Sequence, residues 1–364
     1  MRRLGYRALA LLTVASVLLL SPGRAAEQPE TEFDGYLVRL SDPREWNGPV
    51  LLSAGTCEEV SDGLYRVEDL ETAQAMDQLG MAEYYEPNYR LELLESGSYM
   101  PAQWNLLTVH AQTAWEHTDG QGAYDMRGTG VTVAVIDSGV YREHPDFKQE
   151  HILDYYDLAG TDDGVDVWHG TFVAGVIAAQ VNNALGVDGV APDVTILPIC
   201  VTKNGGSDTA LLIQAIDYAV KQGVDGKYGN ESLKKACQDA VDAGILVIAA
   251  AGNYKSGETK SSACYMYPAS YDGVVSVSAC KQDGETVSFD SSYSYFNDRV
   301  TVAAPGTGVQ SLYLDGGTAT KQGTSFAAPV VTAMAAMAKQ RSRAIAPETF
   351  AALLCGSAVD LGEA

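Results

Sequence analysis

From Gly128 onward, short apolar segments of strand length alternate with longer segments that have helical periodicity. Parallel neighbours in a sheet need a crossover between them, usually a helix. The alternation therefore predicts a doubly wound α/β fold, with helices on both faces of a parallel sheet. The predicted strands cover residues 131–136, 195–201, 245–250, 274–279 and 300–303. The predicted helices cover residues 169–180, 209–221, 233–243 and 325–341.

The alternation breaks once, between the predicted helices 209–221 and 233–243. The segment that joins them is polar and glycine-rich and has no strand pattern. We therefore expect that one central strand of about seven residues is deleted immediately after Asp225. Such a loss would unpair the strands on both sides and leave buried backbone groups unsatisfied, at a cost of about 1–3 kcal/mol each.

Ahead of this domain, residues 35–94 have the pattern of a small α+β unit. Residues 36–40 and 64–67 alternate like strands, and residues 70–79 have helical periodicity. The polar segment 94–99 that follows is a candidate processing linker. The unit is either a removable segment or an N-terminal domain that stays attached.

Residues 1–26 have the pattern of a secretory signal peptide. Arg2, Arg3 and Arg7 precede an apolar run at 8–20, and small residues follow at 21–26. An uncleaved membrane anchor is the alternative, but the apolar run is shorter than the roughly 20 residues that a membrane span needs. We expect a secreted, extracellular protein.

Charge and cysteine content exclude several classes of protein. The net charge of -23 argues against nucleic acid and anionic membrane surfaces as partners, since phosphate binding needs clustered Lys and Arg. The cysteine spacing matches neither a zinc site nor a dense disulfide framework. Cys264 with Cys280 is the one pair for which a disulfide is worth testing, and Cys200 is expected to be a buried apolar residue.

Asp137, His169 and Ser325 each stand where a strand or a glycine turn leads into a predicted helix. A serine hydroxyl needs an imidazole to take its proton, and the imidazole needs a carboxylate to orient it. Taken singly, the three could be a strand-end cap, a helix-start residue and a helix N-cap. Taken together, they predict a nucleophilic hydrolase. Pro329 suits the first turn of the helix that follows Ser325.

An amide donor stands at the end of the apolar strand 245–250. We expect Asn253, with the backbone N–H of Ser325, to bind the oxyanion of a tetrahedral intermediate. The alternative is that Gly252 and Asn253 form an ordinary turn.

The three motifs Val-Ile-Asp-Ser-Gly at 135–139, His-Gly-Thr at 169–171 and Gly-Thr-Ser-Phe-Ala-Ala-Pro at 323–329 resemble those of the subtilisin-like serine proteases, the subtilase family S8. The resemblance implies a secreted serine endopeptidase that hydrolyses polypeptides through an acyl-enzyme. It implies that the walls of the substrate pocket are Ala250, Ala251, Gly252, Tyr267 and Pro268. It also implies that residues 27–98 are a pro-domain that inhibits its own protease. The catalytic domain would then cover residues 99–364, ending short of the family's usual closing segment.

The resemblance further implies a structural calcium site in the loop 180–187. Calcium takes oxygen ligands from carboxylates, amides and main-chain carbonyls. Asp146 and Asn183 would supply side-chain oxygens, and Leu185 and Val187 would supply carbonyls. Gln103 is a further candidate, and a metal-free surface turn is the alternative.

Two other functions stay open at this point. In subtilases, a segment of the type Val-Ile-Asn-x-Ser-Leu-Gly forms a central strand and lines the S1 pocket. A chain without that strand could be a catalytically impaired relic or a binding protein that keeps only the triad. A metal hydrolase that uses His169 with Asp137 is a weaker alternative.

Overall fold

The computed structural model describes residues 9–14, 18–19, 33–41, 57–61, 63–92, 103–116, 125–160, 167–202, 206–223, 232–255 and 257–361. The basic residues and the exit of the predicted signal, the linker 94–99 and the segment 224–231 lie outside these ranges.

The main sheet has the strand order β14-β13-β11-β1-β7-β9-β8, and β15 also pairs with β13. All of its pairs are parallel except the hairpin of β13 with β14. The predicted strands are confirmed within a few residues. They are β7 (Val131–Asp137), β9 (Thr195–Cys200), β11 (Val247–Ala250), β13 (Val275–Asp283) and β15 (Val302–Pro305). The edge strands are β8 (Tyr156–Asp157) and β14 (Thr286–Phe289).

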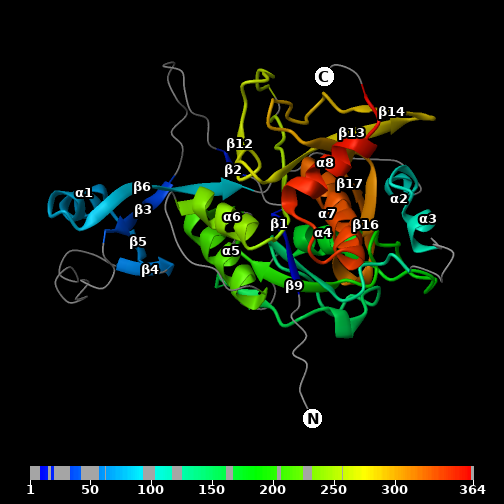
Figure 1. The fold of residues 1–364 in the computed structure, drawn as a ribbon, viewed down its shortest axis with the longest axis horizontal. Coiled ribbons are helices and arrows are strands. Elements are labelled where there is room, and N and C mark those ends of the chain that lie inside the picture. The colour runs from blue at the N-terminus through cyan, green and yellow to red at the C-terminus, as the bar shows by residue number, and fades with distance from the viewer. Residues whose placement is uncertain are drawn as a thin grey trace, which may run out of the picture.

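Helices cover both faces of this sheet (Figure 1). One face carries α4 (Trp168–Ala178), α7 (Thr324–Arg341) and α8 (Pro347–Ser357), and the other carries α5 (Thr209–Gly223) and α6 (Ser232–Asp242). Successive side chains of a strand point to opposite faces. Val133 and Val135 of β7 therefore pack with α4 and α7, whereas Ala134 and Ile136 pack with α5 and α6.

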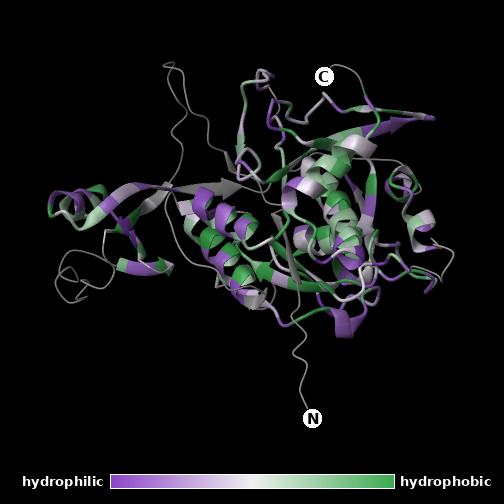
Figure 2. Cartoon of the chain, viewed as in Figure 1, coloured by the Kyte–Doolittle hydropathy of each residue, from purple (hydrophilic) through white to green (hydrophobic). Residues whose placement is uncertain are grey.

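The hydropathy of the helices matches their positions (Figure 2). Hydrophilic and hydrophobic residues alternate along α5 and α6, whereas α7 is mostly apolar or neutral. Every residue of α4 is buried. A helix that is apolar all round belongs in a core, so α4 and α7 are interior helices. α4 contains His169 and α7 contains Ser325, two of the three predicted catalytic residues.

The place between β7 and β11 is taken by β1 (Leu9–Val14), which pairs with both. Residues 9–14, which lie within the predicted signal peptide, thus form a strand in the middle of the sheet. The signal peptide itself stays a prediction. The segment between α5 and α6, where the strand deletion after Asp225 is predicted, lies outside the described residues, so that deletion stays a prediction. Beyond β1, β2 (Leu18–Leu19) pairs antiparallel with β12 (Met266–Tyr267).

The described residues 33–41, 57–61 and 63–92 form the expected small α+β unit, drawn in blue and cyan in Figure 1. Its antiparallel sheet, in the order β6-β3-β5-β4, packs against α1 around a small core of its own. β10 joins this sheet by pairing with β6. The elements are β3 (Phe33–Leu40), β4 (Cys57–Ser61), β5 (Leu64–Val67), α1 (Leu70–Gln78), β6 (Ala82–Glu92) and β10 (Gly206–Asp208).

The remaining elements lie outside the main sheet and the small α+β unit. They are α2 (Trp104–Thr108), α3 (Ala111–Trp115), η3 (Gln149–His151), η4 (Leu314–Gly316), β16 (Val309–Leu312) and β17 (Thr318–Lys321). Within the described ranges, no helix combines the length and the apolar character needed to cross a membrane.

All six cysteines are free thiols, so the disulfide considered for Cys264 and Cys280 is absent. Cys280 is buried in β13, and burial raises the pKa of its thiol to about 12. Because the thiolate is the form that enters disulfide exchange, this burial disfavours oxidation of Cys280. Cys200 is fully buried, as expected.

Candidate active site

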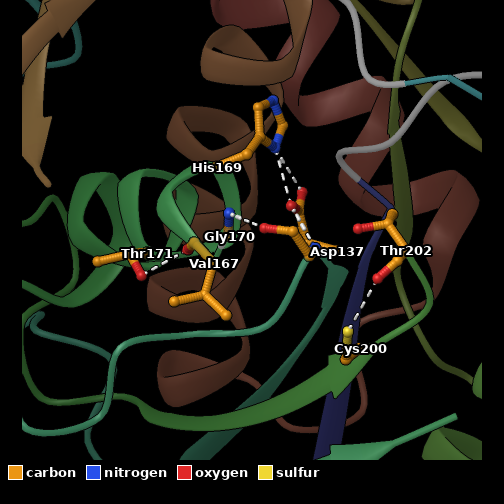
Figure 3. Close-up of polar contacts among 8 residues, drawn as sticks. Asp137, Val167, His169, Gly170, Thr171, Cys200 and Thr202 are labelled. Atoms are coloured by element: carbon orange, nitrogen blue, oxygen red, sulfur yellow. Dashed lines mark hydrogen bonds and ion pairs between the residues drawn. The ribbon is translucent and has the colours of Figure 1, made fainter. Parts of the chain in front are cut away.

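Asp137 and His169 lie at facing ends of two elements and are joined by hydrogen bonds (Figure 3). Asp137 is the last residue of β7, and His169 is in the first turn of α4. The Nδ1 atom of His169 lies 2.8 and 2.9 Å from the two carboxylate oxygens of Asp137. Both side chains are fully buried, so no water competes for this contact.

Glycine at position 170 allows α4 to begin this close to the end of β7. A Cβ on Gly170 would lie 2.1 Å from the carbonyl oxygen of Gly139. Ser138 reinforces the junction, since its N–H donates to Asp137 Oδ1 (2.6 Å) and its hydroxyl accepts from the Gly170 N–H (3.0 Å). Sequence reasoning missed this role of Ser138, although its place in the Asp-Ser-Gly motif could have indicated it.

The other nitrogen of His169 is available for proton transfer. Nε2 is buried and has no hydrogen-bond partner among the residues that the structure describes. The imidazole packs against the rings of Trp168 and Phe326, with centroid distances of 5.2 and 5.3 Å. Phe326 directly follows Ser325, so this contact holds the imidazole beside the start of α7.

Ser325 is buried in the first turn of α7, which begins at Thr324. The positive end of a helix favours negative charge that develops beside it. Pro329 lies beyond the first turn, so the prediction for that residue was wrong by one turn. Proline has no N–H, and at this position it leaves the carbonyl of Ser325 without its usual helical partner.

Asn253 is anchored to α7 through its side-chain oxygen. Oδ1 accepts hydrogen bonds from the backbone N–H and the hydroxyl of Thr324, each 3.0 Å long. The amide nitrogen Nδ2 lies 3.5 Å from the position that a Cβ on Gly323 would occupy. The donor end of this amide therefore faces the turn that carries Ser325. The anchoring by Thr324 is a second contact that the sequence reasoning missed.

The expected pocket walls lie at the ends of β11 and β12. Ala250, Ala251 and Gly252 are buried, and a Cβ on Gly252 would approach Tyr295 to 2.9 Å. Tyr267 is half-buried and Pro268 is buried, and the Tyr267 ring packs on Tyr271 with a centroid distance of 4.6 Å.

The residues expected to hold calcium lie together, with Asp146 in contact with the loop that contains Asn183, Leu185 and Val187. Asp146 accepts hydrogen bonds from the Asn183 amide (2.6 Å) and from the Val187 N–H (2.9 Å). Asn183 Oδ1 accepts from the N–H of Leu185 (3.0 Å). Gln103 lies beside them and makes two hydrogen bonds with the backbone of Asp188.

This loop has the oxygen chemistry that suits a hard cation. Burial raises the pKa of the Asp146 carboxyl, and burial together with the charge of Asp146 raises the pKa of Asp188. A cation would favour the charged form of both. No group of three or more His, Cys, Asp or Glu residues suited to a metal occurs in the described part of the chain. A site here would therefore depend on amide and carbonyl oxygens.

Comparison with known proteins decides the family. The sequence profile described as the subtilase family matches residues 128–364, which contain Asp137, His169 and Ser325. The chain belongs to the subtilase family. It is therefore a member of a class of serine-type endopeptidases.

This subtilase is 34% identical over 245 residues to thermitase from Thermoactinomyces vulgaris, covering 65% of this chain and 81% of thermitase. It is also 34% identical over 273 residues to the minor extracellular protease Epr of Bacillus subtilis strain 168. That match covers 72% of this chain, which spans only 39% of the length of Epr.

Solved structures agree with the fold. A cold-adapted subtilisin-like serine proteinase matches with a TM-score of 0.55 and 29% identity, covering 68% of this subtilase and 91% of that chain. Fervidolysin from Fervidobacterium pennivorans matches with a TM-score of 0.73 and 24% identity. This second match covers 99% of the subtilase and 60% of fervidolysin, and at that identity it concerns the fold alone.

Proposed function

We propose that this subtilase is an extracellular endopeptidase that hydrolyses polypeptides with Asp137, His169 and Ser325. The observation that best supports the proposal is that the two nitrogens of the buried His169 ring differ in their hydrogen bonding. Its Nδ1 atom is held by Asp137 at 2.8 Å, and its Nε2 atom has no partner in the described part of the chain. An imidazole oriented in this way can act as a base only through Nε2.

In the proposed reaction, Ser325 Oγ attacks a peptide carbonyl while His169 Nε2 takes the hydroxyl proton. The C–N bond then breaks, and His169 donates the proton to the leaving amine. An acyl ester remains on Ser325. Water attacks the ester carbonyl while His169 Nε2 takes a proton from it, and His169 returns that proton to Ser325 Oγ as the C–O bond breaks. Asn253 Nδ2 and the Ser325 N–H stabilise the oxyanion that forms before each C–O or C–N bond breaks.

We assign residues 27–98 as a pro-domain that inhibits the enzyme. Three contacts support this assignment. Asn88 Oδ1 accepts from the N–H of Ala210 in the first turn of α5 (3.1 Å). Glu86 accepts from the hydroxyl of Ser232 at the start of α6 (2.6 Å). The end of β6 pairs antiparallel with β10, which follows β9, the strand whose last residue, Cys200, is opposite Asp137.

A structural calcium ion in the loop of Asp146, Asn183, Leu185 and Val187 is part of the proposal. The carboxylate and amide oxygens of Asp146 and Asn183 would hold it, with carbonyls from the loop. The ion would neutralise Asp146 and Asp188 and tie the loop to α4. It takes no part in the reaction.

The extracellular location rests on the N-terminal sequence pattern and on the charge of -23. The relative Epr is named as an extracellular protease. Polypeptide substrates and the chain's own N-terminal unit are the partners we expect, and neither nucleic acid nor a stable membrane partner is among them.

Hydrolysis of a fluorogenic peptide library tests the proposal. The processed protein is expected to cleave internal peptide bonds, and Ser325→Ala is expected to abolish cleavage. Ser262→Ala, at an exposed serine, is the matched control. A chain that binds peptides without cleaving them would support the alternative of a catalytically impaired relic or binding protein. Activity that survives Ser325→Ala but not a chelator would support the metal hydrolase.

A further inference from the structure

β1 lies in the centre of the catalytic sheet. It pairs in parallel with β7 from Leu9 opposite Val131 to Val14 opposite Ile136. On its other side it pairs with β11 from Leu12 opposite Val247 to Val14 opposite Ala249. A central strand satisfies the backbone groups of both neighbours. Without residues 9–14, the facing edges of β7 and β11 would be unpaired inside the protein.

The two neighbours of β1 carry the proposed catalytic groups. β7 ends at Asp137, and β11 leads into Asn253. α5 packs against β1 from one face of the sheet, and α7 packs against it from the other. A strand that is covered on both faces fixes the spacing of the elements around it. β1 therefore sets the distance between the acid side and the oxyanion side of the site.

The same N-terminal segment continues to the wall of the expected pocket. Leu18 and Leu19 of β2 pair antiparallel with Tyr267 and Met266 of β12, next to Pro268. β6 also lies beside β2. β1 thus lies in the middle of the sheet, and β2 lies at the edge where substrate is expected to bind.

The sequence explains why this place is open to an N-terminal segment. Helices α5 and α6 are joined by residues 224–231, which read Val-Asp-Gly-Lys-Tyr-Gly-Asn-Glu. This segment has neither the alternation nor the apolar content of a buried strand. Residues 8–20, by contrast, are almost entirely apolar, as strands buried on both faces are.

We propose that β1 and β2, residues 9–14 and 18–19, are a permanent structural part of this protease. They supply the central strand between β7 and β11 and the adjoining edge of the substrate pocket, in place of a strand between α5 and α6. The same apolar residues can direct export while the chain is unfolded and enter the sheet when it folds. The segment therefore stays bound in the folded protein, and its loss would open the sheet and disable the site.

Hydrogen exchange read by mass spectrometry tests this directly, on the full chain with Ser325→Ala so that it cannot process itself. The amides of residues 9–14 are expected to exchange as slowly as those of β7 and β11. Rapid exchange of residues 9–14, with β7 and β11 still protected, would overturn the proposal. The measurement needs no activity, so its result is independent of the proposed function.

Proline substitution is the second test, because proline cannot donate to a central ladder. Leu12→Pro is expected to lower the Tm by on the order of 10 °C, whereas Leu4→Pro, outside β1, leaves it unchanged. Insertion of Val-Ile-Asn-Ala-Ser-Leu-Gly after Asp225 is expected to restore the Tm of Leu12→Pro. An unchanged Tm in Leu12→Pro, or a failure of the insertion to restore it, would contradict the proposal.

Discussion

Thr324 holds Asn253 by two hydrogen bonds to the same atom. Its N–H and its hydroxyl each donate to Asn253 Oδ1 over 3.0 Å. Because both donors engage the oxygen end of the amide, the nitrogen end is turned toward Gly323 and the start of α7. The residue before Ser325 thus orients the group that is expected to bind the oxyanion.

Thr324→Val is expected to lower kcat about tenfold with little change in KM. Removing an oxyanion donor from a subtilisin costs about 10²- to 10³-fold in kcat, and here the donor stays but loses one of its two anchors. Thr332→Val is the matched control, since Thr332 lies on the same helix and its hydroxyl donates to the Ala328 carbonyl. Equal losses in both variants would indicate damage to α7 in place of a positioning role.

Calcium removal is expected to lower the thermal stability. At a free concentration 100 times the Kd, a bound ion contributes about 2.7 kcal/mol, so a chelator should lower the Tm by roughly 5–10 °C. Asp146→Asn should abolish the response to calcium in differential scanning calorimetry. Asp154→Asn, at an exposed carboxylate, should keep it. If neither calcium nor a chelator changes the Tm of the wild-type protein, the proposed calcium site is ruled out.

Asp290 is expected to stabilise the fold in a pH-dependent manner. Burial opposes the charge of this carboxylate, but hydrogen bonds from Ser292 and Thr307 outweigh it and lower the pKa of Asp290. A group whose pKa is lower in the folded state contributes stability above its unfolded pKa of about 3.9 and loses it as the pH falls through the folded value.

Asp290→Asn should therefore lower the Tm at pH 7 and change it much less near pH 2. Asp283→Asn, at an exposed position in β13, serves as the control and should have little effect at pH 7. A Tm decrease in Asp290→Asn that is the same at both pH values would contradict the assigned cause.

Asn88→Ala is expected to weaken inhibition by the N-terminal unit. The Asn88 side chain is fully buried and caps the start of α5 through Ala210. Loss of such a cap costs about 1 kcal/mol, so the inhibition constant of residues 27–98 added to the processed enzyme should rise about fivefold to tenfold. Gln78→Ala, at the exposed end of α1, should leave it unchanged. Equal inhibition by both variants would argue against this interface.

Local pattern was sufficient to predict much of the catalytic domain. The strand that ends at Asp137 and the helix that begins beside His169 are strongly apolar, so their existence and their ends could be predicted within a residue or two. The position of Ser325 near the start of α7 could be predicted because Gly323 marks the turn before the helix.

Non-local contacts could not be predicted in this way. A short apolar run such as residues 8–20 suits a signal peptide, a buried strand or a helix equally well, and the place of β1 depends on β7 and β11, which lie far along the chain. The anchoring of Asn253 by Thr324 also joins residues that are distant in sequence. Periodicity carries no information about such pairs.

Labelling with a fluorophosphonate tests most directly whether Asp137, His169 and Ser325 form a working catalytic site. The modified residue is identified by mass spectrometry. The reagent reports a serine that an imidazole activates, because an unactivated hydroxyl reacts far more slowly. We predict a single adduct on Ser325 in the processed protein, and its loss in His169→Ala. An adduct on another residue, or no adduct on a folded and processed chain, would contradict the account.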